Sequence, residues 1–351
     1  MLNKLVGNTQ AKHTLKRLVA NRRLPNSLLF TGPDGVGKRQ FAIEAARMML
    51  CQDVAEGEAC GVCAVCTRLS DFIIPQPTDK NKDEFKKVFF GGHGDVGMVV
   101  AYRNFILVDA IRDLEREANF RPYEASARFF IVDDADRMND QAANALLKTL
   151  EEPAMTTYLF LITSRPDSLL PTIRSRCQTL RFAPVSAQEI EAYLIEERAL
   201  QHHDAALAAR LARGSIGRAV DLKVVEFQKQ RQRMFDVLRQ AIVSGDRAAL
   251  LRIAEELNDA KNKEHFAENL DMLESLVHDV WSISVSGDTS RVINTDLGDD
   301  LRRLADHSVP AKFPEWMKMI EEMRLNFAVN INKKVAADAL FVSMAGNATS
   351  V

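Results

Sequence analysis

The sequence has no excess of basic residues. It contains 46 Lys and Arg against 48 Asp and Glu, which gives a formal net charge of −2. This balance excludes the strongly basic surface with which many proteins bind nucleic acid directly. Contact with nucleic acid would therefore need a local patch or the charge of a partner.

Long apolar segments and dispersed cysteines are also missing. No apolar run approaches the roughly 18 residues of a membrane-spanning helix. The N-terminal MLNKLVGNTQAKHTLKRL lacks the apolar core of a signal peptide. We therefore expect a cytoplasmic protein without a membrane segment. Four of the 5 cysteines lie between positions 51 and 66, and a disulfide framework is not expected in that reducing compartment.

The sequence does contain an alternation of strand and helix patterns over residues 1–184. The short apolar runs SLLFTG, RFFIVDDAD, YLFLITS and CQTLRF are each closed by polar or turn residues. Helical patterns lie between them, such as NDQAANALLKTLEEP, which Pro153 ends. This alternation predicts an α/β fold with a parallel sheet and helical crossovers.

The strand pattern ends after residue 184. The segment SAQEIEAYLIEERAL opens on a Ser-x-x-Glu capping box at Ser186, and we predict a small helical domain over residues 185–222. A second helical domain, of about six helices, is predicted over residues 225–346. An apolar stripe in it recurs at helical spacing and predicts a packed bundle. The stripe consists of Phe266, Leu270, Leu273, Val277 and Trp281.

Residues 79–104 are rich in glycine, with GGHGDVG at their centre. Glycine at this density is unusual inside a helix or strand, so we predict a surface insertion and assign it no role. His93 in this segment is expected to be a solvated loop residue rather than a ligand.

The stretch LLFTGPDGVGKRQFA follows a predicted strand and precedes a predicted helix. Gly32, Gly35, Gly37 and Lys38 match a phosphate-binding loop, in which backbone N–H groups and a helix N-terminus face phosphate oxygens. The pattern normally ends in a Ser or Thr that ligates magnesium, but Arg39 stands there. We expect nucleotide binding to be possible and metal-assisted hydrolysis to be crippled. The alternative is a glycine-rich turn without a ligand.

The acidic end of RFFIVDDADRMN is a second candidate. Asp133 is the acid expected beside a metal, and Asp134 stands where a longer glutamate would activate water. A misplacement near 1 Å can cost roughly a hundredfold in rate, so Asp134 weakens hydrolysis further. The other interpretation is that these acids cap the following helix.

Four cysteines have the spacing C-x8-C-x2-C-x2-C: Cys51, Cys60, Cys63 and Cys66. Thiolates so close in sequence can hold a tetrahedral zinc ion at about 2.3 Å, and four protein ligands make a closed, structural site. The alternative is four free buried cysteines. Cys177 stands apart and is expected to be a small buried residue.

The segment TIRSRCQTL places Arg174 and Arg176 on either side of Ser175, just before a predicted strand. An arginine in such a loop can reach across an interface and stabilise charge on a transferring phosphoryl group. The alternative is a pair of solvated arginines.

Together these motifs resemble the clamp-loader branch of the AAA+ ATPases. The resemblance rests on NSLLFTGPDGVGK, the four cysteines, IVDDAD, ANALLKTLEEP and IRSRC. It is dense over residues 1–222 and looser beyond them. It implies an AAA+ P-loop domain over residues 1–184 with a zinc module at about 51–78, a small helical lid over 185–222 and an all-α collar over 225–346.

The resemblance also implies site roles. This sequence departs from the ATPase motor subunits, gamma or tau, at Arg39, at Asp134 and at Gly217. The motor subunits carry a nucleotide-sensing arginine at the last of these positions, whereas Arg218 here lies one residue later, about 100° around a helix. Three departures in one site favour the branch's largely non-hydrolysing subunit, with Arg176 as a finger supplied in trans to a neighbouring motor subunit. ATP or ADP would bind weakly, if at all, at Gly32, Gly35, Gly37, Lys38, Asp133, Asp134 and Ser164.

The implied partners are those of the bacterial DNA polymerase III clamp loader: the gamma/tau and delta subunits, the sliding clamp, and primer–template DNA through the complex. The isolated chain is not expected to be an ATPase. Two alternatives remain, an active gamma/tau-type ATPase and a zinc-dependent DNA-binding protein. The second is disfavoured because residues 51–78 contain one arginine and no lysine.

Overall fold

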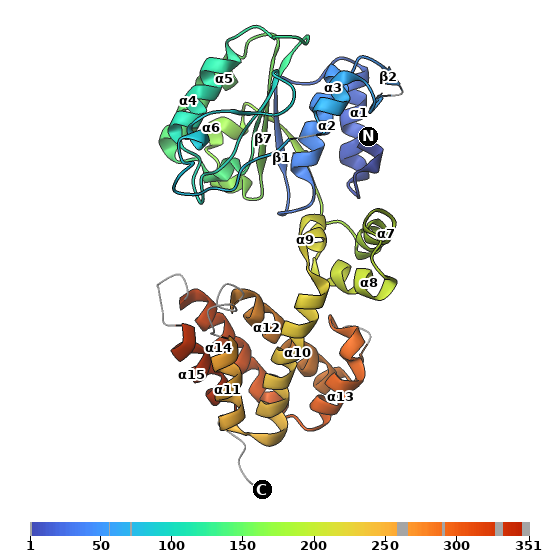
Figure 1. Ribbon diagram of the computed structural model, residues 1–351, viewed down its shortest axis with the longest axis vertical. Helices are drawn as coiled ribbons and strands as arrows, with labels where there is room; N and C mark the ends of the chain where they lie inside the picture. Colours follow the sequence, from blue (N-terminus) through green and yellow to red (C-terminus); the bar gives the residue numbers. More distant parts are fainter. Residues whose placement is uncertain are drawn as a thin grey trace. The chain divides into compact units, whose positions relative to one another are not determined.

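The structure is a computed structural model that describes residues 2–55, 57–70, 72–257, 266–289, 292–326 and 333–345. The chain divides into two compact units, Met1–Asp221 and Leu222–Val351 (Figure 1). The predicted lid, up to Asp221, belongs to the first unit, and the division into three domains stays a prediction. Parts of the predicted collar, such as residues 258–265 and 346, lie outside the described residues.

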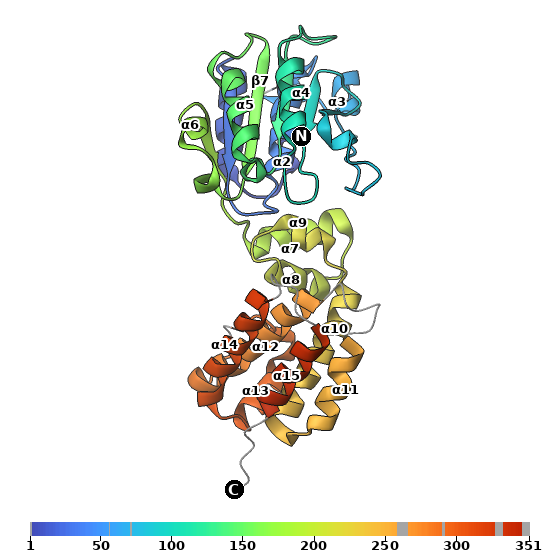
Figure 2. The ribbon, with the colours of Figure 1, turned by 90° about the vertical axis from the view of Figure 1, so that its left-hand side faces the viewer.

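A six-stranded sheet forms the centre of the first unit (Figure 2). Its strand order is β4-β5-β6-β7-β1-β8, and every neighbouring pair is parallel except β4 and β5. The predicted parallel sheet is thus confirmed. The strands are β1 (Ser27–Thr31), β4 (Phe89–Phe90), β5 (Val96–Val99), β6 (Arg128–Val132), β7 (Thr157–Thr163) and β8 (Gln178–Arg181), with a separate hairpin of β2 (Val54–Ala55) and β3 (Glu58–Ala59).

Helices cover both faces of the sheet. Alternate strand residues face opposite sides, so Leu28 and Phe30 pack with α1 and α2, whereas Leu29 packs with α4 and α5. Burial on both faces explains why β1, β5, β6 and β7 are apolar nearly throughout. The α-helices of the first unit are α1 (Thr9–Ala20), α2 (Lys38–Leu50), α3 (Ala64–Arg68), α4 (Val108–Ala118), α5 (Asp140–Glu151) and α6 (Pro171–Arg174), followed by α7 (Ala187–Arg198), α8 (His202–Leu211) and α9 (Ile216–Asp221), which pack on one another.

The predicted helix signals act where the sequence places them. Asn139 caps α5, since its side chain accepts a hydrogen bond from the N–H of Ala142 at 2.9 Å, and the helix ends two residues before Pro153. The capping box between Ser186 and Glu189 is formed at the start of α7.

The prediction of a surface insertion at residues 79–104 is wrong. This segment contributes β4 and β5 to the central sheet, and all of Val96–Val99 is buried. Gly97 lies inside β5, where an added Cβ would sit 2.4 Å from Val88 Cγ1, so the glycine marks a close approach rather than a loop. His93 is 0% exposed and is not a solvated residue.

The second unit is helical. In the predicted apolar stripe, Phe266, Leu270, Leu273 and Val277 are buried in α12, and Trp281 is half-buried. No helix among the described residues is long and apolar enough to span a membrane. The described helices are α10 (Val224–Arg239), which continues into a π-turn at Gln240–Ser244, α11 (Arg247–Leu257), α12 (Phe266–Ser286), α13 (Gly298–Asp306), α14 (Phe313–Asn326) and α15 (Lys333–Ala345).

Candidate functional site

The four predicted metal ligands come together at the C-terminal end of α2. Cys51 follows that helix, Cys60 follows the β2–β3 hairpin, and Cys63 and Cys66 flank the start of α3. Their sulfurs all lie within 4.8 Å of one another. The Cys51–Cys63 and Cys60–Cys66 sulfur pairs are each 4.0 Å apart, close to the roughly 3.8 Å between thiolates on a tetrahedral zinc ion. The donor set and its spacing fit zinc.

Backbone groups around these cysteines favour thiolate formation. The N–H of Cys60 donates to Cys51 Sγ at 3.2 Å, and the N–H of Cys63 donates to Cys60 Sγ at 3.3 Å. Backbone hydrogen bonds from Gln52 and Cys66 lower the pKa of Cys63 to about 6. Burial raises the pKa of Cys51 and of Cys66, so these two thiols need the charge of a cation to ionise at neutral pH.

The glycine-rich loop and the acidic motif meet at one edge of the sheet. The strands β1, β6 and β7 are parallel, so their carboxyl ends lead to the loop, to Asp133 and to Ser164 at the same edge. Ligands of open α/β sheets bind at this edge. The predicted nucleotide residues are therefore brought together, with Ser164 half-buried at the end of β7.

The loop is held by the fold itself. Gly32 has a φ of 151°, and an added Cβ there would lie 2.4 Å from the carbonyl oxygen of Phe182. Lys38 donates to the carbonyl oxygens of Gly32 and Pro33, each at 2.6 Å. The lysine is buried, and this burial lowers its pKa. Its ammonium group is thus engaged by the loop's own carbonyls.

Arg39 contacts Asp133, the acid predicted to lie beside a metal. Its Nε donates to Asp133 Oδ2 at 2.6 Å, and a terminal nitrogen of the guanidinium contacts the same oxygen. The Arg39 side chain is 50% exposed, whereas that of Asp133 is 8% exposed. The arginine at the position predicted for one metal ligand therefore contacts the acid predicted for a second.

The next two acids also have arginine partners. Asp134 lies 3.2 Å from Arg137, and burial followed by repulsion from Asp133 raises the pKa of Asp134. Burial opposes ionisation of Asp136, but hydrogen bonds from Thr163 and Arg165 outweigh it and lower its pKa.

The start of α9 touches the loop. The N–H of Gly217 donates to the carbonyl oxygen of Gly35 at 2.9 Å, and Ser215 lies beside the same glycine. Arg218, by contrast, is exposed. At the position predicted for a nucleotide-sensing arginine, the structure therefore has a backbone contact between α9 and the glycine-rich loop.

The two arginines of the predicted finger loop have different neighbours. Arg176, after α6, lies 2.7 Å from Glu151 and donates to the carbonyl oxygen of Thr172 at 2.9 Å. Arg174 lies 2.8 Å from Asp167. Cys177 is buried, as predicted, and burial raises its pKa to about 12.

Sequence reasoning missed a buried ionic cluster at the opposite edge of the sheet. Arg128 at the start of β6 is 0% exposed and lies 3.5 Å from Asp95 and 3.2 Å from Glu117. The rings of Phe90, Tyr123 and Phe130 lie 5.0–5.6 Å from its guanidinium. No local pattern could reveal this cluster, because Asp95 lies in the segment predicted to be an insertion and Glu117 lies 11 positions from Arg128 in α4.

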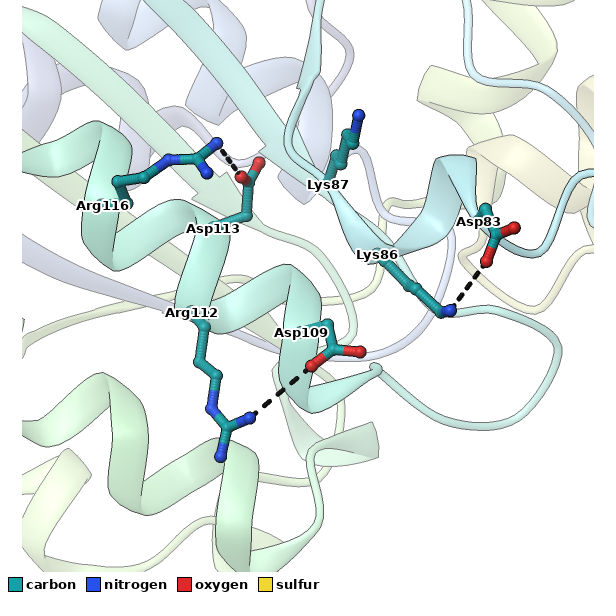
Figure 3. Close-up of a pocket in the computed structure, with 7 residues that line it drawn as sticks. All are labelled: Asp83, Lys86, Lys87, Asp109, Arg112, Asp113 and Arg116. Atoms are coloured by element: carbon teal, nitrogen blue, oxygen red, sulfur yellow. Dashed lines mark hydrogen bonds and ion pairs between the residues drawn. The ribbon is translucent and has the colours of Figure 1, made fainter.

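Sequence reasoning also missed an open groove of about 380 Å³ along α4 (Figure 3). Its charged side chains largely neutralise one another, with ion pairs between Asp83 and Lys86 and between Asp109 and Arg112. A third pair joins Asp113 and Arg116. Because the positive and negative side chains of this groove nearly balance, the groove favours neither an anionic nor a cationic ligand.

The family that matches this chain and three of its relatives are all named as subunits of one enzyme, DNA polymerase III. The family described as "DNA polymerase III, delta subunit" matches residues 7–186. The DNA polymerase III subunit delta' of Bacillus subtilis (strain 168) is 31% identical over 315 residues, which cover 88% of each chain. The subunit delta' of Escherichia coli (strain K12) is 30% identical over 290 residues, or 82% of this chain and 78% of that one. The Bacillus subtilis subunit tau is 30% identical over 186 residues, or 53% of this chain and 30% of tau.

Proposed function

The chain belongs to the family of DNA polymerase III delta' subunits, and from this premise we propose that it is a clamp-loader subunit that does not hydrolyse ATP itself. It helps to load the sliding clamp onto primed DNA during replication. Its partners are the gamma/tau and delta subunits and the clamp, and it meets primer–template DNA through the complex. Its fold in this proposal is that of an AAA+ P-loop domain with a zinc module, a helical lid and a helical collar.

The ion pair between Arg39 and Asp133 is the observation that carries the non-hydrolysing role. Metal-assisted phosphoryl transfer needs a hydroxyl and a carboxylate on magnesium. Here the hydroxyl is absent and the carboxylate accepts a hydrogen bond from Arg39 at 2.6 Å. The short Asp134 and the contact of Gly217 with the loop support the same conclusion.

Arg176 is the proposed arginine finger for a neighbouring ATPase subunit. The guanidinium is planar and permanently charged, so it suits charge spread over phosphate oxygens. It lies on a surface loop, where an exposed ion pair with Glu151 holds it. Such pairs are weak, so a partner's nucleotide can compete for this side chain.

The four cysteines hold one structural zinc ion in this proposal. A closed shell of four thiolates leaves no coordination position for water or substrate. The ion would fasten α3 and the β2–β3 hairpin to the end of α2. The cysteine geometry supports this role and gives no support for catalysis by the metal.

A gamma/tau-type ATPase is the second candidate, favoured by the similarity to tau over 53% of this chain. The same similarity covers 30% of tau, and the arginine on Asp133 argues against hydrolysis. Turnover by the isolated chain separates the two.

The test combines assembly and turnover. The purified chain should co-elute with gamma/tau and delta subunits as one complex that loads a sliding clamp, and the complex without it should not load. ATP turnover by the isolated chain should equal the buffer blank, with the gamma/tau subunit as positive control. Vigorous turnover by the isolated chain would establish the motor assignment, and failure to join the complex would remove the clamp-loader role.

A further inference from the structure

Asp133 is the acid that would hold a divalent cation in a working ATPase, and in this chain it is already engaged. It lies at the carboxyl end of β6 with its side chain 8% exposed. Arg39 projects from the first turn of α2, which is the position of the metal-ligating hydroxyl in a phosphate-binding loop. Two nitrogens of its guanidinium meet Asp133 Oδ2, one of them at 2.6 Å.

The charges around this pair are also balanced internally. Each of the three acids that follow β6 has an arginine partner, and the loop lysine is bonded to carbonyl oxygens. The pairs are Asp133 with Arg39, Asp134 with Arg137, and Asp136 with Arg165. The cluster therefore needs no added cation to neutralise its carboxylates.

We propose that the guanidinium of Arg39 occupies the divalent-cation position of this site and excludes the metal. A magnesium ion needs a near-octahedral shell of oxygens at 2.0–2.1 Å, and a cation that approaches Asp133 meets the positive guanidinium first. The residues present therefore do not fit the magnesium that an ATPase of this fold uses.

The position of Arg39 also determines whether a nucleotide would bind this site with or without a metal ion. Half of the Arg39 side chain is exposed, so its remaining N–H groups can face phosphate oxygens while Nε stays on Asp133. The site is thus suited to a nucleoside polyphosphate without metal. This inference rests on the proposed function, which makes the loop a relict nucleotide site, and adds the reason for its loss of metal.

The test is a manganese titration followed by electron paramagnetic resonance, with and without ADP. The full chain is first saturated with zinc, so that the cysteines do not take up the probe. Wild type and Asp133→Asn should bind Mn²⁺ equally. Arg39→Thr should bind one Mn²⁺ at least tenfold more tightly in the presence of ADP, and Arg39→Thr combined with Asp133→Asn should lose this gain.

Two further variants serve as controls. Arg39→Lys keeps a positive charge beside Asp133 and should gain no Mn²⁺ site. Arg137→Thr removes the neighbouring arginine and should gain none either, because its partner Asp134 is not the metal-side acid. Equal gains in Arg137→Thr and Arg39→Thr would mean that release of any acid suffices, and the assignment to Arg39 would fail.

Titration of wild type and Asp133→Asn decides the proposal even if Arg39→Thr does not fold. A wild-type Mn²⁺ site that Asp133→Asn abolishes would overturn it, as would a folded Arg39→Thr chain without added affinity. These readouts do not depend on clamp loading. A chain that loads clamps but binds Mn²⁺ at Asp133 would refute the role of Arg39 alone, whereas a chain that excludes Mn²⁺ but does not join the complex would refute the function alone.

Discussion

Replacing Arg176 with alanine tests whether this chain supplies a finger to its neighbour. In the isolated chain the guanidinium lies 2.7 Å from Glu151, and the Arg176 side chain is 35% exposed. An exposed ion pair of this kind is worth at most about 1 kcal/mol. Arg176 must break this ion pair before it can turn to a partner's phosphate. The cost therefore reduces the rate enhancement that Arg176 gives by no more than about fivefold.

The rate enhancement expected from an arginine finger is much larger than the cost of breaking the pair between Arg176 and Glu151. An arginine finger raises turnover by roughly a thousandfold or more, which corresponds to about 4 kcal/mol at 1.36 kcal/mol per decade. After subtraction of the pair with Glu151, about 3 kcal/mol remains. Arg176→Ala should therefore slow turnover at the neighbouring site by about 200-fold, while the other ATPase sites of the complex keep their rates.

The assay is DNA- and clamp-stimulated ATP turnover of the reconstituted complex, with clamp loading measured in parallel. Arg174→Ala is the matched control, since that arginine has an ion pair of similar length with Asp167 at 2.8 Å. Glu151→Gln should change turnover by fivefold at most. If Arg176→Ala loads clamps at the normal rate, or if Arg174→Ala does equal damage, Arg176 is not a finger.

Four other outcomes are expected. Protein prepared without added metal should contain about one zinc per chain by elemental analysis, and Cys63→Ala should lose it; native protein without metal, its four thiols freely titrating, would contradict this. Arg39→Thr should not create measurable ATP turnover, because the short acid and the lid contact remain; a large gain would show that the missing hydroxyl is the sole defect. Arg128→Met should destabilise the first unit to urea by about 3–5 kcal/mol, because it leaves the buried Asp95 carboxylate without its cation; a loss within error would mean that the backbone N–H groups of residues 123–125, which donate to Asp95 at 2.8–3.0 Å, compensate its charge by themselves. The lowered folded pKa of Asp136 stabilises the fold above its ordinary value of 3.8, and this contribution is lost as the pH falls through the folded pKa; Asp136→Asn should therefore show a weaker loss of stability below about pH 4 than wild type, and an unchanged pH profile would exclude the linkage.

Motifs whose residues are close in sequence could be predicted. The four cysteines occupy a short segment, so their convergence needed only one helix end and one hairpin. The loop from Gly32 to Lys38 was predictable because a strand, a turn and a helix start follow one another. In both cases spacing along the chain nearly fixes distance in space.

Pairings across the fold could not be predicted in the same way. Arg39 and Asp133 are 94 positions apart, and only the parallel order of β1 and β6 brings their ends to one edge. Gly97 was wrongly predicted to lie in a loop. In the structure it is a strand residue at which the side chain of Val88 leaves no room for a Cβ, and the sequence does not distinguish such a glycine from one in a loop. Arg128 stood in the sequence as an ordinary strand residue, since no nearby sequence feature predicts its ion pairs with Asp95 and Glu117.

The packing of Gly32 bears on how such a site is inherited. Its backbone conformation and the nearby carbonyl oxygen of Phe182 forbid a side chain whether or not phosphate binds. The same constraint on substitution at Gly32 would therefore act on any chain of this fold that no longer binds nucleotide. Lys38 also has a structural role, since its ammonium group donates to the carbonyl oxygens of Gly32 and Pro33 within the loop. Packing can thus preserve a phosphate-binding sequence motif during evolution, even in a protein that no longer binds phosphate.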